Sequence, residues 1–191
     1  MIKKTILLAL MATALFSTYL QAADYIIDSR GAHASINFKI KHLGYSWLTG
    51  RFDSFEGQFS YDPAKPASSK ISVQIDTTSI SSNHAERDKH LKSKDFLEVS
   101  RFATATFTST SMKASKDGSM TITGVLSLHG IDKNIVIEAH KIGEGDDPWG
   151  GYRAGFSGTT RLALKDFGIN TNLGPSSTHV ELELHVEGVR Q

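Results

Sequence analysis

The chain has 191 residues, no cysteine and a formal net charge of +1, with 21 basic against 20 acidic side chains. The absence of cysteine excludes disulfide bonds, thiol catalysis and cysteine-based zinc sites. A near-neutral charge without a basic block gives no footprint for nucleic acid or an anionic membrane surface, so we expect neither nucleic-acid binding nor stable membrane insertion.

Residues 1–22 have the pattern of a cleaved export signal. Lys3 and Lys4 precede an apolar run over residues 6–15 that is too short to cross a bilayer, and the small residues Ala22 and Ala23 follow it. Cleavage after Ala22 leaves 191 − 22 = 169 residues and a net charge of +1 − 2 = −1, because two lysines are removed. We expect residues 23–191 to form one domain, exported through the Sec pathway to a bacterial periplasm.

Apolar and polar side chains alternate along most of the remaining chain. Between residues 178 and 188, Val180, Leu182, Leu184 and Val186 lie between polar neighbours, and this period of two is typical of a β-strand with one apolar face. The same alternation predicts strands over residues 24–28, 33–42, 49–61, 70–77, 103–112, 120–128, 135–139 and 152–164. One helix is expected, over about residues 84–92, with Ser82 or Asn83 as its N-cap.

This pattern predicts an all-β fold with one short helix. About eight strands joined by short loops are expected to close into an antiparallel barrel, because closure removes the exposed edges of an open sheet. A barrel of this size either fills with side chains or holds one small ligand. Gly57, Gly124 and Gly158 fall where bulky inward side chains are expected, so they either permit sharp bending or leave room for a guest.

No motif for catalysis or metal binding stands out. His84 and His90 are six residues apart and do not share a helix face, and no serine lies in a Gly-x-Ser-x-Gly elbow. The acidic loop over residues 144–147 lacks the spacing of a calcium loop. The remaining candidates lie on turns or polar strand faces, where we expect them to be solvated: His129, His140, His179 and His185. We therefore expect no catalytic residue and no metal site.

The expected helix carries three polar side chains close together. Arg87, Asp88 and His90 cluster beside Leu91 and the apolar pair at residues 96–97, at what should be one rim of the barrel. These polar side chains either brace the helix against the rim or hydrogen-bond the polar head of a ligand whose tail lies inside. A few polar groups at the mouth of an apolar pocket are a common means of orienting a ligand.

Several sequence blocks resemble the bacterial YceI family. They include His-Leu-Gly-Tyr-Ser-Trp-Leu at residues 42–48, Asn-His-Ala-Glu-Arg-Asp-Lys-His-Leu at 83–91 and Gly-Asp-Asp-Pro-Trp-Gly-Gly at 145–151, and the match spans essentially all of residues 23–191. The resemblance implies a lipocalin-like, eight-stranded antiparallel barrel in the periplasm that binds polyisoprenoids or other long-chain amphiphiles in an internal pocket. Transport, storage and stress protection are all open as its role. Lys141 departs from the expected apolar inward residue, and its stem can reach the rim.

From the residues and the resemblance together we expect a non-enzymatic carrier, with a polyisoprenoid or quinone-like lipid as its hydrophobic ligand and no other cofactor. Arg87, Asp88 and His90 are expected to face the head group, and a two-fold homodimer is the expected assembly. The alternatives are a lipid-modifying enzyme with His90 and Asp88 as an acid–base pair, and a side-chain-filled barrel with a structural or stress role. Trp47 and Trp149 are expected to close the ends of the barrel, and the lipid tail to lie against Ile36, Phe38, Ile40, Phe59, Val73, Ile75, Phe107, Leu126, Phe156, Leu164 and Leu184.

Overall fold

The computed structural model describes residues 22–115 and 117–191, so the expected export signal lies outside it except for its last residue. Within this part the chain forms eleven strands and one α-helix, α1 (Ala85–Leu91). The strands are β1 (Ala23–Ile27), β2 (Ser35–His42), β3 (Ser46–Phe52), β4 (Phe55–Tyr61), β5 (Lys70–Asp76), β6 (Ile80–Ser81), β7 (Thr104–Ala114), β8 (Ser119–Leu128), β9 (Ile131–Asp146), β10 (Tyr152–Ala163) and β11 (His179–Arg190).

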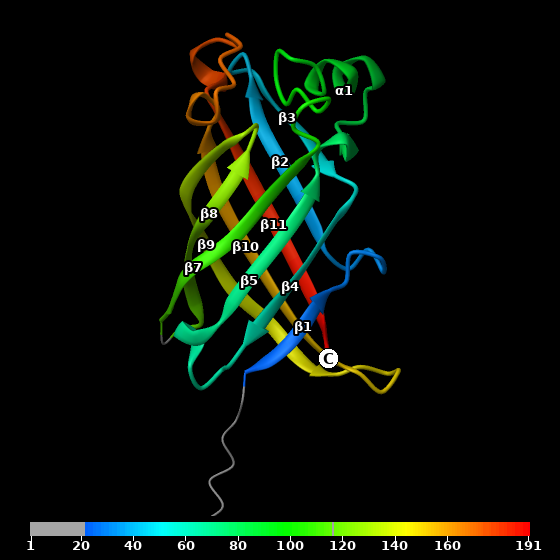
Figure 1. Ribbon diagram of the computed structural model, residues 1–191, viewed down its shortest axis with the longest axis vertical. Coiled ribbons are helices and arrows are strands. Elements are labelled where there is room, and N and C mark those ends of the chain that lie inside the picture. Colours follow the sequence, from blue (N-terminus) through cyan, green and yellow to red (C-terminus); the bar gives the residue numbers. More distant parts are fainter. Residues whose placement is uncertain (1–21, 116) are drawn as a thin grey trace, which may run out of the picture.

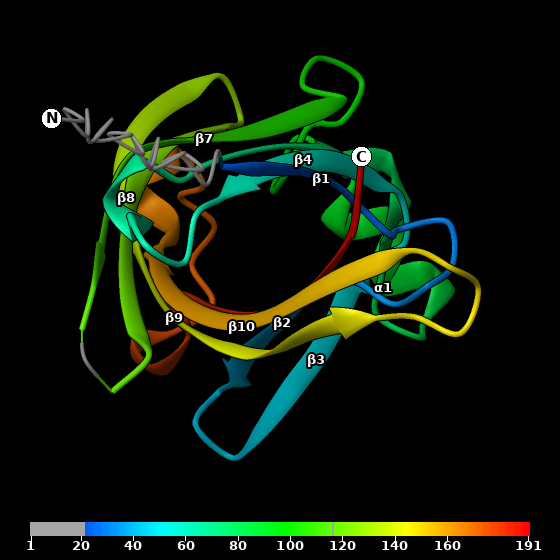
Figure 2. The same ribbon diagram turned by 90° about the horizontal axis from the view of Figure 1, so that it is seen from below.

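Eight of these strands form a closed ring in the order β1-β4-β5-β7-β8-β9-β10-β11, which β1 completes by pairing with β11. Every pairing is antiparallel, and Figure 2 shows the ring along its axis. The predicted eight-stranded antiparallel barrel is therefore confirmed. Closure satisfies the backbone hydrogen bonds of each strand on both sides and leaves the ring without an edge.

The two ends of the barrel are built differently. β11 pairs with β1 through residues 188–190 and with β2 through residues 180–185, so β1 and β2 use successive parts of the same edge. β2 continues into β3, which pairs with the two-residue β6, and α1 follows directly. In Figure 1, α1 and the β2–β3 hairpin lie together at the upper end. The ring is thus closed by β1 below and extended by β2, β3 and α1 above.

Several predicted elements differ in their limits. The strand expected over residues 135–139 is β9, which runs from Ile131 to Asp146 and takes in most of the acidic loop expected over residues 144–147. The strand expected over residues 49–61 is interrupted at Asp53 and Ser54, whose backbone bonds to Ser79 and Asp76 replace strand pairing. The helix begins at Ala85, and its N-cap is His84, whose Nδ1 accepts a hydrogen bond of 3.2 Å from a backbone N–H in the first turn. The expectation that residue 82 or 83 would serve as N-cap is wrong.

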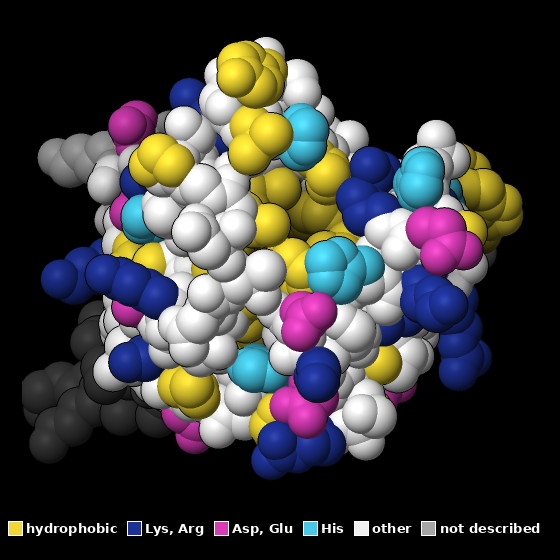
Figure 3. Space-filling model, turned by 90° about the horizontal axis from the view of Figure 1, so that it is seen from above, with side chains coloured by type: hydrophobic (Ala, Val, Ile, Leu, Met, Phe, Trp, Pro, Cys, Tyr) yellow, Lys and Arg dark blue, Asp and Glu magenta, His cyan; other side chains and the backbone are white. Residues whose placement is uncertain are grey.

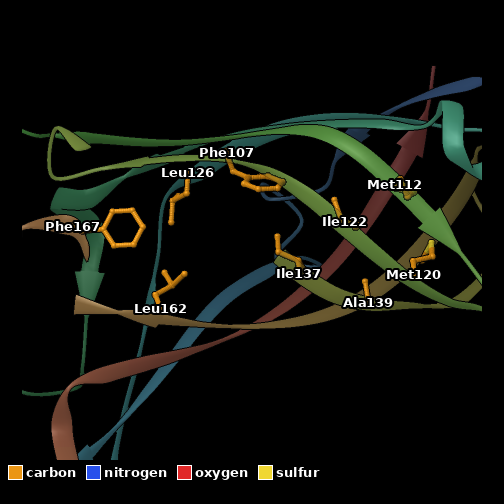
Figure 4. Close-up of a cluster of buried hydrophobic side chains, with 9 residues drawn as sticks. All are labelled: Phe107, Met112, Met120, Ile122, Leu126, Ile137, Ala139, Leu162 and Phe167. Atoms are coloured by element: carbon orange, nitrogen blue, oxygen red, sulfur yellow. The ribbon is translucent and has the colours of Figure 1, made fainter. Parts of the chain in front are cut away.

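The lower half of the barrel is filled with side chains. Figure 4 shows a core cluster that extends along the barrel, from Phe167 and Leu162 at the cavity end to Met112 and Met120 at the lower end. A Cβ atom at Gly124 would lie 2.5 Å from the Phe107 ring, so this glycine lets the ring lie flat against the wall. Cβ atoms at Gly57 and Gly158 would also meet the barrel's own atoms at 3.0 Å or less. These glycines therefore do not leave room for a ligand, and that one of the two predicted roles is wrong.

Candidate functional site

The upper half of the barrel encloses a cavity of about 650 Å³ that opens between α1, the β2–β3 hairpin and residues 172–177. Figure 3 shows its mouth as an apolar hollow with basic and histidine side chains at the border. The polar lining residues all belong to the segments around this mouth, whereas the walls below consist of leucine, isoleucine, valine, alanine and phenylalanine. These polar residues are Lys41, His42, Arg87, His90, Asn172 and Ser177.

A smaller space of about 80 Å³ lies further down and shares part of its wall with the cavity, including Leu126 and Leu182. Beneath it, four aromatic rings close the barrel. Tyr25 and Phe59 stack with ring centroids 4.7 Å apart, and the edge of Phe156 contacts Phe59 at 5.5 Å. Tyr61 meets Phe156 at 5.1 Å. We call these four residues the aromatic plug; it makes the cavity blind at its lower end.

The residues predicted to line the lumen occupy three levels. Ile36, Phe38, Ile40, Ile75, Leu126 and Leu164 line the upper cavity. Val73, Phe107 and Leu184 line the smaller space below it. Phe59 and Phe156 belong to the aromatic plug and do not line either space. The plug arises because inward aromatic side chains of β1, β4 and β10 meet at one level of the barrel.

The two tryptophans do not close the ends of the barrel. Trp47 precedes the inward-facing Leu48 on β3, so it points outward, and 47% of its surface is exposed. Trp149 lies in the β9–β10 hairpin and is 78% exposed. Its ring packs on the guanidinium of Arg153, whose carbon is 5.6 Å from the ring centroid. The prediction that both residues seal the lumen is therefore wrong in its geometry.

At the mouth, the three polar residues predicted on the helix are used differently. Arg87 donates from Nε to the Ser82 hydroxyl at 2.7 Å and still lines the cavity. Asp88 accepts hydrogen bonds from the hydroxyl and the N–H of Ser82, and these, the hydroxyl bond first, lower the pKa of its carboxyl group. Asp88 is not part of the cavity lining, so its role is to stabilise the start of α1 through Ser82. Arg87 contacts both Ser82 and the cavity.

His90 also lines the cavity, and its environment bears on the acid–base hypothesis. Its Nε2 lies 3.3 Å from Oδ2 of Asp95, and its ring meets Phe96 edge-on at 4.9 Å. Within the described residues, no hydrogen bond joins His90 to Asp88. The pair proposed for the enzymatic alternative is therefore not assembled, and His90 is instead placed as a polar group at the rim.

Several cavity residues were not in the predicted set because they lie in irregular segments around the mouth. Phe96 and Leu97 follow α1 and are buried, as the apolar pair in the sequence suggested. Ile169 and Leu173 come from the segment between β10 and β11, where no alternation marks an inward side. Such residues could have been identified in the sequence as apolar side chains within otherwise polar loops.

One histidine expected to be solvated is instead mostly covered by neighbouring residues. Only 13% of the His129 side chain is exposed, and its Nδ1 lies 2.8 Å from the carbonyl oxygen of Phe167. Its ring packs against Phe102 at 4.8 Å. The expectation of a solvated turn histidine is wrong here because residues on both sides of the mouth fold over the β8–β9 turn. His129 joins these two segments beneath the cavity mouth.

A cluster of charged residues holds the lower part of the barrel together, and we call it the Arg153 cluster. The guanidinium of Arg153 contacts Asp28 at 2.7 Å, Glu187 at 2.6 Å and Asp147 at 2.9 Å. His33 adds a contact of 3.0 Å to Asp28. Asp28, His33 and Glu187 are close enough together to hold a metal ion, but Arg153 bonds to both carboxylates and supplies the positive charge there.

The same contacts set the ionisation of the cluster. Hydrogen bonds from His33 and Arg153 lower the pKa of Asp28 from its ordinary 3.8 to about 2. The three carboxylates in turn raise the pKa of Arg153. At the same end of the barrel, Lys141 faces inward with its Nζ 2.8 Å from Glu144, which raises the lysine's pKa. This lysine reaches the lower rim and lies far from the cavity mouth.

No helix in the described part of the chain is long and apolar enough to cross a membrane.

Comparison with known proteins places this geometry in a family. A YceI-like domain matches residues 25–188. A UPF0312 protein of Shewanella baltica is 57% identical over 190 residues, which covers 99% of this chain and all of the relative. A YCEI protein of Campylobacter jejuni has a similar structure, with a TM-score of 0.71 and 28% identity over 80% of this chain and 91% of the other.

Two more distant structures share the fold. BcnA of Burkholderia cenocepacia has a TM-score of 0.75 at 20% identity, covering 84% of this chain and 98% of BcnA. A polyisoprenoid binding domain from Saccharophagus degradans has a TM-score of 0.63 at 15% identity, covering 90% of this chain and all of that domain. The resemblance noted in the sequence is confirmed across residues 25–188, and this chain belongs to the YceI-like family.

Proposed function

We propose that this chain is a periplasmic carrier that holds one long apolar chain, of the polyisoprenoid or quinone-like class, in the upper half of its barrel. The observation that carries the proposal is the cavity itself, about 650 Å³ of space with apolar walls and polar residues confined to the mouth. Its volume lies within the roughly 300–1,000 Å³ typical of small-molecule sites. Export by the signal at residues 1–22, with residues 23–191 as one domain, is part of the proposal.

The size of the cavity limits the ligand. A methylene group needs about the same room as a water molecule, roughly 30 Å³, so the cavity accommodates a chain of about 20 carbon atoms. A longer chain must leave part of its length outside, because the aromatic plug blocks the lower end. The polyisoprenoid binding domain from Saccharophagus degradans supports the ligand class only through its shared fold.

The head group is expected at the mouth, near Arg87 and His90. Burial of the tail supplies most of the affinity, at about 25 cal/mol per Å² of apolar surface removed from water. Chain length should therefore matter more than the chemistry of the head group. Arg87→Ala should weaken binding without abolishing it, and a loss as large as that from blocking the cavity would contradict this division.

Mass spectrometry of lipids extracted from the protein purified from its native compartment tests the proposal. We expect one long-chain lipid per protein molecule in the wild type and depletion of that lipid in Leu182→Trp, which occupies about a quarter of the cavity and leaves too little room for the longest chains. Val136→Trp is the matched control, because Val136 is 47% exposed on the outer face of β9. Equal lipid content in both variants would overturn the proposal.

A further inference from the structure

The β2–β3 hairpin exposes apolar and aromatic side chains beside the cavity mouth. Tyr45 is 87% exposed, Leu43 is 55% exposed and Trp47 is 47% exposed. Figure 2 shows this hairpin projecting away from the ring of strands. Leu43 also lines the cavity, so the exposed surface is continuous with the mouth. We call Leu43, Tyr45 and Trp47 the hairpin tip.

The backbone of the turn shows that a leucine at the tip has a cost. Leu43 and Gly44 have φ angles of 52° and 85°, and the turn is closed by a hydrogen bond of 3.0 Å from the Tyr45 N–H to the His42 carbonyl. Asn-Gly is the favoured pair where both central residues have positive φ, and a bulky residue there is strained. Leu43 is therefore held against local preference at the border of the cavity, where 55% of it stays exposed to solvent.

Positive charge surrounds the hairpin tip. The Nζ atoms of Lys39 and Lys41 lie 5.1 Å and 5.5 Å from the centroid of the Trp47 ring. Arg161 lines the same shallow surface beside Trp47. Glu181 pairs with Lys39 at 3.3 Å, while Lys41 has no ion pair within the described residues. The surface around the tip therefore has more basic than acidic side chains and complements an anionic partner. The near-neutral charge of the whole chain predicted no such surface, because these basic residues come together only in the folded chain.

The opposite end of the barrel provides an internal comparison. Trp149 and Ile142 are also exposed there, at 78% and 66%. Their surroundings are acidic, however, with Glu144 and Asp146 in the same hairpin, and the Trp149 ring packs on Arg153. Trp149 thus packs on an arginine that three carboxylates already neutralise, whereas Trp47 lies beside Lys41, which has no ion pair among the residues described.

We propose that the hairpin tip docks the cavity mouth on the surface of an anionic lipid bilayer. Tyrosine and tryptophan favour the level of the lipid head groups, and lysines beside them are attracted to anionic lipids. The contact is peripheral and reversible, because only one hairpin enters the interface. Docking depends on this surface alone, whereas passage of a chain from the bilayer into the cavity rests on the proposed function.

Flotation of the purified protein with vesicles tests the docking. Wild type should float with vesicles of phosphatidylethanolamine and phosphatidylglycerol and bind less to phosphatidylcholine. Replacing both aromatic residues, Tyr45→Ser with Trp47→Ser, should lower the partition coefficient about tenfold or more. Ile142→Ser, the matched exposed apolar residue at the acidic end, should float like wild type. Lys41→Gln should reduce the preference for anionic vesicles about fivefold.

A spectroscopic arm locates the contact. The chain has two tryptophans, so Trp149→Phe leaves Trp47 as the sole reporter, and its emission should shift to shorter wavelength with anionic vesicles. Absence of this shift, or flotation of the double variant at the wild-type level, would overturn the proposal. If the double variant fails to fold, Tyr45→Ser alone carries the test, because that side chain is 87% exposed.

Binding of a dissolved isoprenoid alcohol to the cavity is measured in parallel. A protein that docks on vesicles but binds no isoprenoid alcohol would support the docking and count against the proposed function. A protein that binds the alcohol but does not dock on vesicles would support the proposed function and count against the docking. The two proposals can therefore fail separately.

Discussion

A larger side chain on one wall of the cavity should shorten the longest lipid chain that the protein binds. Leu182 lies in the middle of β11, opposite Phe38 on β2 and Thr160 on β10, and it lines both the upper cavity and the space below. Its side chain is only partly buried, because it faces open space inside the barrel. Leu182→Trp should therefore place the larger side chain in this space without displacing a packed neighbour.

The magnitude follows from the volume that is lost. Tryptophan has about six more heavy atoms than leucine, each needing roughly the room of one methylene group, so a chain of about 20 carbons loses room for about six. At about 0.8 kcal/mol per methylene, the upper limit of the effect is about 5 kcal/mol. A chain that moves toward the mouth recovers part of this. We expect a loss of about 2–3 kcal/mol, or about 30- to 150-fold in Kd, for the longest chains.

The assay is isothermal titration with a series of isoprenoid alcohols and fatty acids of increasing length. Chains of about 14 carbons or fewer still fit beside the new indole and should bind Leu182→Trp as they bind the wild type. Val136→Trp, which adds the same side chain on the outer face, should bind every length normally. An equal loss at all lengths would indicate a damaged fold, and no loss for the longest chain would refute the placement of the ligand in this cavity.

Two further predictions concern the stability of the lower half. Asp28→Asn removes a carboxyl group whose pKa is lowered from 3.8 to about 2. In the wild type, ionised Asp28 should therefore raise the free energy of unfolding by about 2 kcal/mol above pH 5, and this contribution should be lost as the pH falls toward 2. Urea unfolding at pH 7 and pH 2 should show this difference in the wild type and a much smaller one in the variant, and an unchanged pH dependence would contradict it. Gly124→Ala should lower the free energy of unfolding by about 1–3 kcal/mol, because its Cβ would lie 2.5 Å from the Phe107 ring, and a stability equal to wild type would show that the ring moves freely.

The sequence predicted the barrel well because alternation is a local property. In β2, Ile36, Phe38 and Ile40 line the cavity, as their spacing of two requires, and Leu182 on β11 does so for the same reason. Closure was inferred from the cost of open edges and did not need any single contact. The pairing of β1 with β11 that completes the ring involves residues more than 150 positions apart, and no local pattern indicates it.

The candidate site was less predictable where distant residues decide its shape. Phe59 and Phe156 have the inward parity of lumen residues, yet they meet Tyr25 and Tyr61 across the barrel and form a floor. Whether an inward ring lines a cavity or fills it depends on its neighbours on other strands. Trp47, which was predicted to close one end, was placed wrongly for a simpler reason, since the register that turns Leu48 inward turns Trp47 outward.

The barrel combines a densely packed lower half with an apolar cavity in its upper half. The aromatic plug and the Arg153 cluster lie in the lower half, where β1 completes the ring and ties its first and last strands. In the upper half, β3 meets the two-residue β6 on its outer side and irregular segments form the mouth. The aromatic plug and the Arg153 cluster are thus at one end of the barrel and the cavity is at the other. Since the floor is fixed by packed rings, the distance from the aromatic plug to the mouth should set the length of lipid chain that this protein accepts.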